Sequence, residues 1–508
     1  MTISLDKLRR DARRLQKSHA AGEPVAQERL RLHPPRQDGR ALRLADYLHV
    51  VAQENNFASW PALKLVAETI GLDRAAKRQR LLVAQAQGQV DVVATLLADT
   101  PDLADGVLGL HIGLFDLPAV RAALENDPTL ATQPLGPRLP ILHLCFSRWL
   151  KKRPELEADM LAIADLLLEN GADVNSALVG FQGSREPLSA LYGAIGHADN
   201  MPLARWLLDH GANPNDGESL YHATELGHHE GLRMLLDHGA DPKGTNALLR
   251  AMDFHDHAAV ELLIAHGARV DDFDPTHVGG EAPWTAPALH QAGRRMCDVR
   301  MIDILMRAGA DPAAMWQGAS AYGYARVFGN TALARAIEAA GTVPDLNREE
   351  RLMARAAEGQ ESPGEFINPD KLPEAYRNII RQILHLPGKL DHVKRLVALG
   401  VEYDRPDTEG LTPVQLAGWE GLPEVLDYFL RLMPDLTHVN RYGGTLLTTI
   451  LHGADNNPNR AERDHIECLR LVLEHGLALP RAVLNNVAND DIAAYLRDWA
   501  ARYPGQVD

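Results

Sequence analysis

Pairs of leucines or similar apolar residues recur along the chain, and each pair is followed after a few polar residues by a glycine and a small residue. The copies lie at residues 166–173, 207–213, 235–241, 262–268 and 304–311. Each predicts a helix that ends in a left-handed residue, a conformation that glycine adopts without a Cβ clash. A single helical hairpin cannot bury its own apolar face, so neighbouring hairpins must stack and share a core. The pattern therefore predicts an all-α solenoid of stacked helical hairpins.

The start of each hairpin carries a second motif, which is best kept as Thr-Pro-Val-Gln-Leu-Ala at residues 412–417 and partly kept at 142–145 and 289–292. This motif resembles the opening of the ankyrin repeat, Thr-Pro-Leu-His-x-Ala, and Gly-His-His-Glu at 227–230 resembles the entry to its second helix. The resemblance implies an ankyrin-repeat solenoid that binds protein partners on its concave face. The glycines of successive copies are 28 to 42 residues apart, which indicates short hairpin tips in some repeats and inserted loops in others.

The repeats divide the chain into four predicted segments. Residues 1–72 form an N-terminal helical cap, in which Phe57 and Trp60 are core anchors and Ser59 is a helix N-cap. This segment resembles the N-terminal helical part of many bacterial ankyrin-repeat proteins. Residues 73–345 are a first ankyrin block, 346–373 a degenerate helix with a linker-like insertion, and 374–508 a second block that ends in a cap.

Composition and charge narrow the functional classes. The 508 residues carry a formal net charge of −16. Residues 1–43 contain eleven basic and five acidic residues, a net charge of +6, so the rest of the chain carries about −22. Such an acidic array disfavours nucleic-acid binding. Three cysteines far apart in the sequence favour a reducing cytoplasm over a disulfide framework. No apolar stretch reaches the roughly 18 residues needed to span a membrane. We also expect the chain to be a monomer.

The 22 histidines raise the alternative of a metal site. Four of them fall just before a helix-ending glycine, where an imidazole can bond the last helical carbonyls: His210, His238, His266 and His475. The ankyrin resemblance implies that His143 and His290 form hydrogen bonds between neighbouring repeats. The densest group is the patch of His222, His228 and His255, near Asp253 and Asp256. We keep this patch as the alternative site of metal binding or catalysis.

No phosphate loop or nucleophile elbow is present in the sequence. We therefore predict a non-catalytic protein with no catalytic, cofactor-binding or metal-binding residues. The alternative is an enzyme whose site lies in the histidine patch or in the 346–373 insertion. A second alternative is a secreted effector or a toxin-immunity protein that uses the same binding surface.

The predicted partner-binding residues lie on insertions and beside them, because exposed aromatic and arginine side chains are favoured as interface anchors. Nearby carboxylates would give the surface a negative charge and favour a partner with a basic segment. The predicted residues are Phe181, Arg185, Phe273, His277, Trp284, Asp253 and Asp256.

Overall fold

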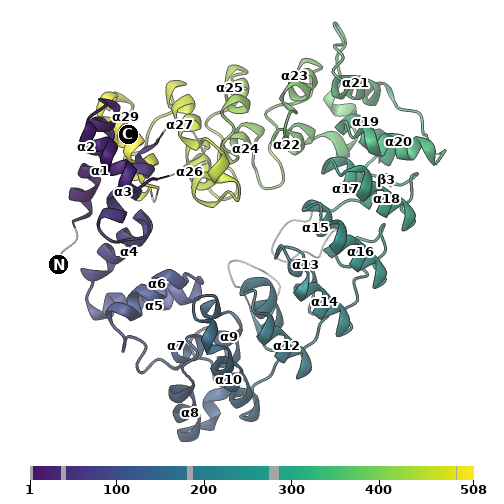
Figure 1. The fold of residues 1–508 in the computed structure, drawn as a ribbon. Coiled ribbons are helices and arrows are strands. Elements are labelled where there is room, and N and C mark those ends of the chain that lie inside the picture. Colours follow the sequence, from purple (N-terminus) through teal and green to yellow (C-terminus); the bar gives the residue numbers. More distant parts are fainter. Residues whose placement is uncertain (1–3, 36–41, 180–186, 274–284, 342, 488) are drawn as a thin grey trace. The chain divides into compact units, whose positions relative to one another are not determined.

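The computed structural model describes residues 4–35, 42–179, 187–273, 285–341, 343–487 and 489–508. The chain divides into two compact units. The first unit consists chiefly of Met1–Phe254 and Ala258–Ala268, and the second chiefly of His255–His257, Arg269–Phe273 and Trp284–Asp508. Both units are built from helices joined as hairpins (Figure 1).

Four helices open the first unit: α1 (Leu5–Ala20), α2 (Pro24–Leu32), α3 (Leu44–Glu54) and α4 (Trp60–Ile70). They share an apolar cluster that includes Leu15, Val51 and Leu63, and Trp60 is buried in it while Phe57 packs against its edge. The Ser59 hydroxyl accepts a hydrogen bond from Ala62 N at 3.3 Å, which confirms the predicted N-cap of α4.

Arg29 fastens α2 to the two helices beside it. Its Nη2 atom lies 2.9 Å from Asp11 Oδ2 on α1 and 2.6 Å from Glu54 Oε2 on α3. The three side chains are about a quarter exposed, so solvent screens these ion pairs only in part. The pairs fix the orientation of α2, which contributes few apolar residues to the cluster.

The rest of the first unit consists of hairpins, each made of a first and a second helix. The pairs are α5 (Arg74–Ala86) with α6 (Val90–Asp99), α7 (Leu108–Gly113) with α8 (Leu117–Asn126), and α9 (Pro140–Cys145) with α10 (Glu157–Glu169). They continue with α11 (Ala190–Tyr192) and the π-helical turn η5 (Gly193–His197) before α12 (Met201–Asp209), then α13 (Ser219–Ala223) with α14 (Glu230–Asp237) and α15 (Ala247–Asp253) with α16 (His257–Ala265). In Figure 1, α13 and α15 lie along one side of this stack, and α14 and α16 lie along the other. We call these the first-helix side and the second-helix side.

The second unit continues with the same type of hairpin. Its pairs are α17 (Ala288–Arg294) with α18 (Val299–Arg307), α19 (Ala321–Phe328) with α20 (Thr331–Ala339), α22 (Ile379–Ile383) with α23 (Leu390–Ala398), α24 (Pro413–Trp419) with α25 (Pro423–Arg431), and α26 (Leu446–Asn456) with α27 (His465–Glu474). A single helix, α21 (Arg348–Ala357), stands between α20 and α22, and α28 (Arg481–Asn486) and α29 (Asp490–Arg502) close the chain.

The second helices end as the sequence predicts. The glycines at these helix ends have φ between +86° and +99°: Gly171, Gly211, Gly239, Gly267, Gly309 and Gly476. Four of these glycines follow a histidine whose ring forms a hydrogen bond with a carbonyl oxygen in the last helical turn. His210 Nδ1 lies 2.7 Å from Trp206 O, and the same contact is 2.8 Å long from His238 to Met234 O. His266 and His475 make it as well, at 2.9 and 2.8 Å, so the predicted capping role of all four histidines is confirmed.

A left-handed residue also stands between the two helices of a hairpin. Glycine fills this position at residues 227, 329 and 421, whereas Phe115, Asp199, His255 and Met296 occupy it in other hairpins with φ between +53° and +61°. An L-residue held there costs about 1 kcal/mol or more relative to an ordinary conformation. The fold therefore imposes this conformation on the junction even where the sequence carries no glycine.

Two short strand pairs form within loops between hairpins, and a chain of side-chain hydrogen bonds joins successive loops. Strands β1 (Ala177–Leu178) and β2 (Leu188–Ser189) pair antiparallel, as do β3 (Met315–Trp316) and β4 (Ala319–Ser320). In the loop that follows a second helix, an Asn or Asp oxygen accepts from a backbone N–H of the next repeat. Asn175 Oδ1 accepts from Asn213 N at 2.8 Å, and Asn215 Oδ1 accepts from Asp241 N at 2.7 Å. Two pairs in the second unit repeat the contact, Asp271 with Asp311 N and Asp404 with Asp435 N. We call these contacts the Asn/Asp ladder.

The segment from 346 to 373 contributes to the core of the second unit. Helix α21 packs on α19, and Ile367 and Leu372 from the following loop are buried in the same cluster as Tyr324 and Tyr376. Tyr376 donates a hydrogen bond to Glu350 Oε1 at 2.8 Å, and both residues are buried. These residues therefore hold two repeats together. The four-segment division of the chain stays a prediction.

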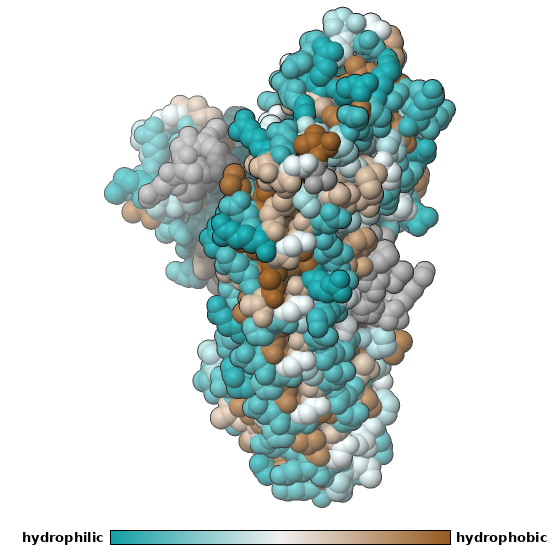
Figure 2. Space-filling view, turned by 90° about the vertical axis from the view of Figure 1, so that its right-hand side faces the viewer, coloured by the Kyte–Doolittle hydropathy of each residue, from teal (hydrophilic) through white to brown (hydrophobic). Residues whose placement is uncertain are grey.

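The exterior is mostly polar on the face that Figure 2 shows, where apolar residues occur in small separate groups among hydrophilic ones. Within the residues that the structure describes, no helix combines the length and the apolar character needed to cross a bilayer.

Candidate functional site

The structure describes three of the seven predicted partner-binding residues. Asp253 ends α15 in the first unit, whereas Asp256 and Phe273 belong to the second unit. Phe181, Arg185, His277 and Trp284 lie outside the described residues. The predicted group as a whole therefore stays a prediction. Among its described residues, Asp253 has the contacts that define a candidate site.

Asp253 is part of a compact cluster around Arg250 on the first-helix side. The Arg250 guanidinium donates from Nε to Glu225 Oε1 at 2.7 Å and from Nη1 to Asp253 Oδ2 at 3.3 Å. Its central carbon lies 4.9 Å from the ring centroid of Phe254 and 5.5 Å from that of Tyr221. The guanidinium is thus held by two carboxylates and lies over two aromatic rings. We call Tyr221, Glu225, Arg250, Asp253 and Phe254 the Arg250 platform.

His222 extends the platform toward the preceding repeat. Its Nδ1 atom lies 2.8 Å from Glu225 Oε2, and its Nε2 atom lies 3.3 Å from Glu218 Oε2 in an ion pair. The imidazole edge also contacts the Tyr192 ring, with centroids 4.9 Å apart. Only 2% of the Glu218 side chain is exposed, and neither of its oxygens has a hydrogen-bond partner. His222 therefore connects two carboxylates of its own repeat with Tyr192 of the preceding repeat.

The carboxylates change the titration of His222. Burial favours the neutral imidazole, but the contacts with Glu218 and Glu225 outweigh burial and raise the pKa of His222 to about 9. Burial also favours protonation of Glu225, and the contacts with His222 and Arg250 instead lower the pKa of Glu225. At neutral pH the structure therefore holds a protonated His222 between two carboxylates.

Raising the pH from 6.5 to 9 is expected to weaken the folded first unit. The pKa of His222 is about 9 in the folded chain and about 6.5 in an unfolded one. The folded state therefore binds the proton more tightly, and its advantage is full below pH 6.5 and lost as the pH rises through 9. The difference amounts to at most about 3 kcal/mol. Urea denaturation of the parent chain and of His222→Gln across this range measures it. The variant should lose most of the pH dependence, and an unchanged slope would contradict the assignment.

His228 of the predicted patch, and His257 in the next hairpin, have carboxylate partners of their own. His228 Nε2 lies 2.9 Å from Asp199 Oδ1, and His257 Nε2 lies 2.8 Å from Asp298 Oδ1. His255 is an exposed left-handed residue at a hairpin junction. In the part of the chain that the structure describes, no three His, Cys, Asp or Glu side chains come together in a way that could hold a metal ion. The geometry thus gives the metal-binding alternative no support at this patch.

The three cysteines are buried in the packed core. Burial raises the pKa of the thiols of Cys145 and Cys468. A nucleophilic cysteine needs an accessible thiolate, and these two thiols are kept neutral. Their role in the structure is that of small apolar core residues.

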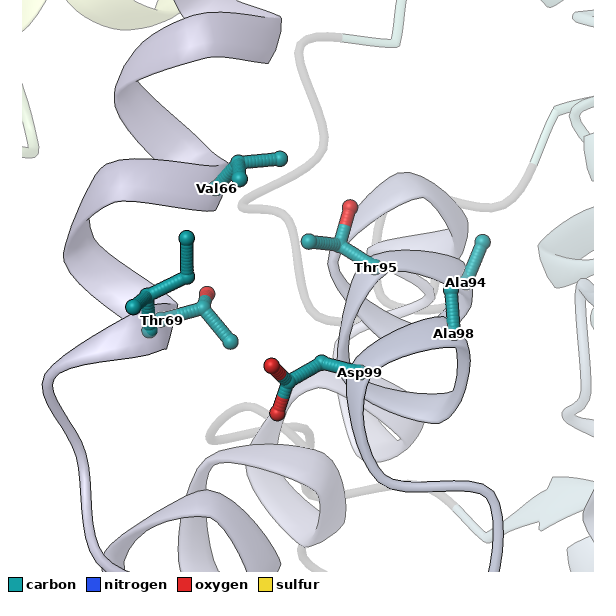
Figure 3. Close-up of a pocket in the computed structure, with 7 residues that line it drawn as sticks. Val66, Thr69, Ala94, Thr95, Ala98 and Asp99 are labelled. Atoms are coloured by element: carbon teal, nitrogen blue, oxygen red, sulfur yellow. The ribbon is translucent and has the colours of Figure 1, made fainter. Parts of the chain in front are cut away.

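The described surface also contains a groove between α4 and α6 in the first unit, with a volume of about 420 Å³. Val66, Thr69 and Ile70 line one wall, and Ala94, Thr95, Ala98 and Asp99 line the other. In Figure 3, Val66 and Thr69 face Thr95 and Asp99 across the groove. The carboxylate of Asp99 is paired with Lys77 Nζ at 2.5 Å. The groove therefore offers contacts with small apolar side chains, and the Asp99 carboxylate in its wall is already paired with Lys77.

Comparison with known proteins identifies the type of repeat. Residues 156–246 and 191–274 match the family model described as ankyrin repeats in three copies. Among solved structures, the human ASB11 ankyrin repeat domain is 22% identical and aligns over 47% of this chain and 99% of its own, with a TM-score of 0.33. The ankyrin repeat domain of Bcl-3 is 21% identical over 46% of this chain and 98% of its own, with a TM-score of 0.35.

A bacterial structure is also similar, an ankyrin repeat domain from Acinetobacter baumannii AYE. It is 24% identical over 39% of this chain and 97% of its own, with a TM-score of 0.30. No curated protein sequence gives a significant match.

The observed architecture is that of an all-α repeat protein made of stacked helical hairpins. Residues 156–274 match the ankyrin-repeat model, and the predicted all-α solenoid of stacked helical hairpins is confirmed.

Proposed function

We propose that the chain is a non-catalytic scaffold that binds a protein partner on the first-helix side of its ankyrin repeats. Ankyrin repeats are in general protein–protein interaction modules. The observation that carries the proposal for this chain is the Arg250 platform. It places aromatic and charged side chains, partly exposed and already held in one arrangement, on the side formed by the first helices. Such preorganised aromatic and arginine side chains are typical of interface anchors.

The proposed interface combines the platform with the residues predicted from the sequence. Asp253 belongs to the platform itself. Aromatic anchors at Phe181, Phe273 and Trp284, together with Arg185, His277 and Asp256, would extend the contact on either side of it in the sequence. The carboxylates favour a partner with a basic segment, because complementary charge raises the rate and the specificity of association. The chain binds this partner as a monomer.

Affinity capture from native cells with the purified full-length chain tests the proposal. The captured protein is then titrated against two variants that each remove one carboxylate. Asp253→Asn changes the first-helix side, and Asp237→Asn changes an exposed residue of α14 on the second-helix side. We expect Asp253→Asn to weaken binding by about tenfold, as a loss of roughly 1.4 kcal/mol predicts, while Asp237→Asn leaves it unchanged. If the captured partner binds both variants as tightly as the parent, or if only Asp237→Asn weakens binding, the interface lies elsewhere.

A further inference from the structure

The outer face of α1 is strongly basic in a chain that is otherwise acidic. The helix contains six Lys or Arg residues and two carboxylates, a net charge of +4, whereas residues 44–508 carry about −22. The apolar side chains of α1 face the other way, since Ala12 and Leu15 are buried in the apolar cluster of the first four helices and Leu5 and Leu8 pack against it. The face that points away from this cluster therefore consists mainly of cations.

Five exposed cations lie within one arc of the outer face. At 3.6 residues per turn they fall within about 120° of the helix circumference, opposite the side that carries Ala12 and Leu15. We call them the α1 basic stripe: Lys7, Arg10, Arg13, Arg14 and Lys17.

Neighbouring members of the stripe repel one another. Several of them are three or four residues apart, which places their side chains next to each other, and like charges at these spacings destabilise a helix. The pairs are Lys7 with Arg10, Arg10 with Arg13, Arg10 with Arg14, Arg13 with Lys17, and Arg14 with Lys17. The stripe therefore lowers the stability of α1 unless negative charge is brought to it.

The structure neutralises the cations beside the stripe but leaves most of the stripe itself uncompensated. Both arginines of α2 are paired with carboxylates. Within the stripe, Arg14 lies 3.0 Å from Asp11, a carboxylate that Arg29 also engages. The other carboxylate of α1, Asp6, lies 3.5 Å from Arg9. The remaining four members of the stripe are exposed and have no ion-pair partner among the residues that the structure describes.

The length of the stripe and the charge of the remaining chain determine which anion fits. The stripe runs from Lys7 to Lys17, about 15 Å along the helix, which suits a short acidic segment of a protein. A nucleic-acid duplex or a bilayer surface is larger than the stripe and is also repelled by the net negative charge of the remaining chain. Insertion into a bilayer would need apolar side chains on the same face, whereas those of α1 belong to the cluster or pack against it.

We propose that the α1 basic stripe docks an acidic segment of a protein partner, whose Asp and Glu side chains pair with the arginines and lysines of the stripe. Arginine suits this role because its guanidinium binds a carboxylate through two parallel hydrogen bonds. The inference goes beyond the proposed scaffold function, since it adds a second docking surface, of the opposite charge preference, on the N-terminal helices.

Fluorescence polarisation with a labelled peptide of about ten glutamates tests the proposal on the full-length chain at low ionic strength. A stripe variant combines Arg10→Gln, Arg13→Gln and Lys17→Gln, and glutamine keeps a similar helix propensity. The control variant removes the same charge from three exposed arginines on the second helices α8, α14 and α20: Arg121→Gln, Arg233→Gln and Arg335→Gln. Circular dichroism melting curves are recorded for all three proteins.

We expect the peptide to bind the parent and to lose affinity as the salt concentration rises. The stripe variant should bind at least about tenfold more weakly, and the control variant should stay within about twofold of the parent. The stripe variant should also melt at or above the temperature of the parent, because repulsive pairs are removed from α1. The inference is overturned if the peptide binds the stripe variant as tightly as the parent, or if the control loses as much affinity. A lower melting temperature of the stripe variant would show that these cations hold the helices together, and would overturn it as well.

Other occupants of the stripe give different results in the same assay. Vesicles of phosphatidylcholine with phosphatidylserine, and a DNA duplex of about twenty base pairs, are titrated against the parent and the stripe variant. If either binds the parent more tightly than the peptide does and loses this affinity in the stripe variant, the stripe belongs to a membrane or nucleic-acid site and the proposal fails. It fails too if sedimentation shows that the parent alone self-associates at low salt and the stripe variant does not, because a second copy would then occupy the stripe. None of these measurements involves Asp253, so the scaffold function is tested separately.

Discussion

Lowering the pH from 7 to 5 is expected to reduce the free energy of unfolding of the second unit by several kcal/mol. The cause is a set of buried histidines that the fold keeps neutral. Burial lowers the pKa of His290 and of His385 to about 4, and that of His392 to about 3. Nearby cations add to the effect at each site, Arg294 for His290, three arginines for His385, and Lys389 with Arg395 for His392.

The direction follows from proton uptake. Between pH 6.5 and 4 the unfolded chain binds protons at these histidines and the folded chain does not. Stability therefore falls as the pH drops through this range. At pH 5 a shift from 6.5 to about 4 corresponds to a loss of about 2 kcal/mol for each histidine. His222 in the first unit keeps its stabilising effect on acidification, because its folded pKa is raised.

His392 offers the cleanest measurement, since it is 4% exposed and neither ring nitrogen has a hydrogen-bond partner. Urea denaturation at pH 7 and pH 5 measures how far acidification lowers the free energy of unfolding. This decrease should be about 2 kcal/mol smaller for His392→Leu than for the parent. The control is His475→Gln, which changes an exposed histidine of the same unit. Acidification should lower its free energy of unfolding by the same amount as in the parent. Equal losses in His392→Leu and in the parent would refute the account.

Gly453→Ala is expected to destabilise the second unit by about 3 kcal/mol or more, the upper range for overpacking a core. Gly453 lies on α26 where this helix crosses α24, and a Cβ atom there would stand 2.2 Å from Trp419 O and 2.9 Å from Trp419 Cα. These are backbone atoms, so no side-chain rotation can relieve the clash. The same carbonyl also lies 3.0 Å from His465 Nε2, and a shift of α24 would break that contact.

Gly505→Ala is the matched control for this substitution, because nothing lies within 4 Å of the Cβ position at Gly505. Thermal and urea denaturation of both variants should show a large loss for Gly453→Ala and a change within about 0.5 kcal/mol for Gly505→Ala. Similar stabilities for Gly453→Ala and the parent would mean that α24 and α26 are further apart than the structure shows.

The sequence predicted most of the fold because its main signals are local. An apolar stripe, a helix-ending glycine and a histidine before it each depend on neighbours within one turn, so Gly211 and His210 behave as predicted. The hydrogen bond from His290 to Ala319 O, at 3.1 Å, confirms the contact between repeats that the ankyrin resemblance implies. By contrast, Met296 and Phe115 in left-handed junctions carry no local signal, because tertiary packing imposes their conformation.

The candidate site was only partly predictable. The sequence pointed to Asp253 and to His222, but the interpretation of His222 as part of a metal-binding alternative rested on the number of nearby histidines. The structure instead pairs His222 with Glu218 and Glu225, which lie four residues before it and three after it. That spacing on a helical segment was the available signal. The role of Arg250 could not be read from the sequence, because its partner Glu225 comes from the preceding repeat.

The Asn/Asp ladder determines how a local disturbance spreads along the repeats. Each contact joins a side-chain oxygen of one repeat to a backbone N–H of the next, as Asn175 does with Asn213 and Asn215 with Asp241. Fraying of either loop thus removes the hydrogen-bond partner of the other, and the loss can spread along the chain in both directions. In a linear array whose repeats contact only their neighbours, such links lengthen the segment that opens cooperatively. The loops so joined should therefore exchange their amide hydrogens as a group, at a rate set by the weakest repeat among them.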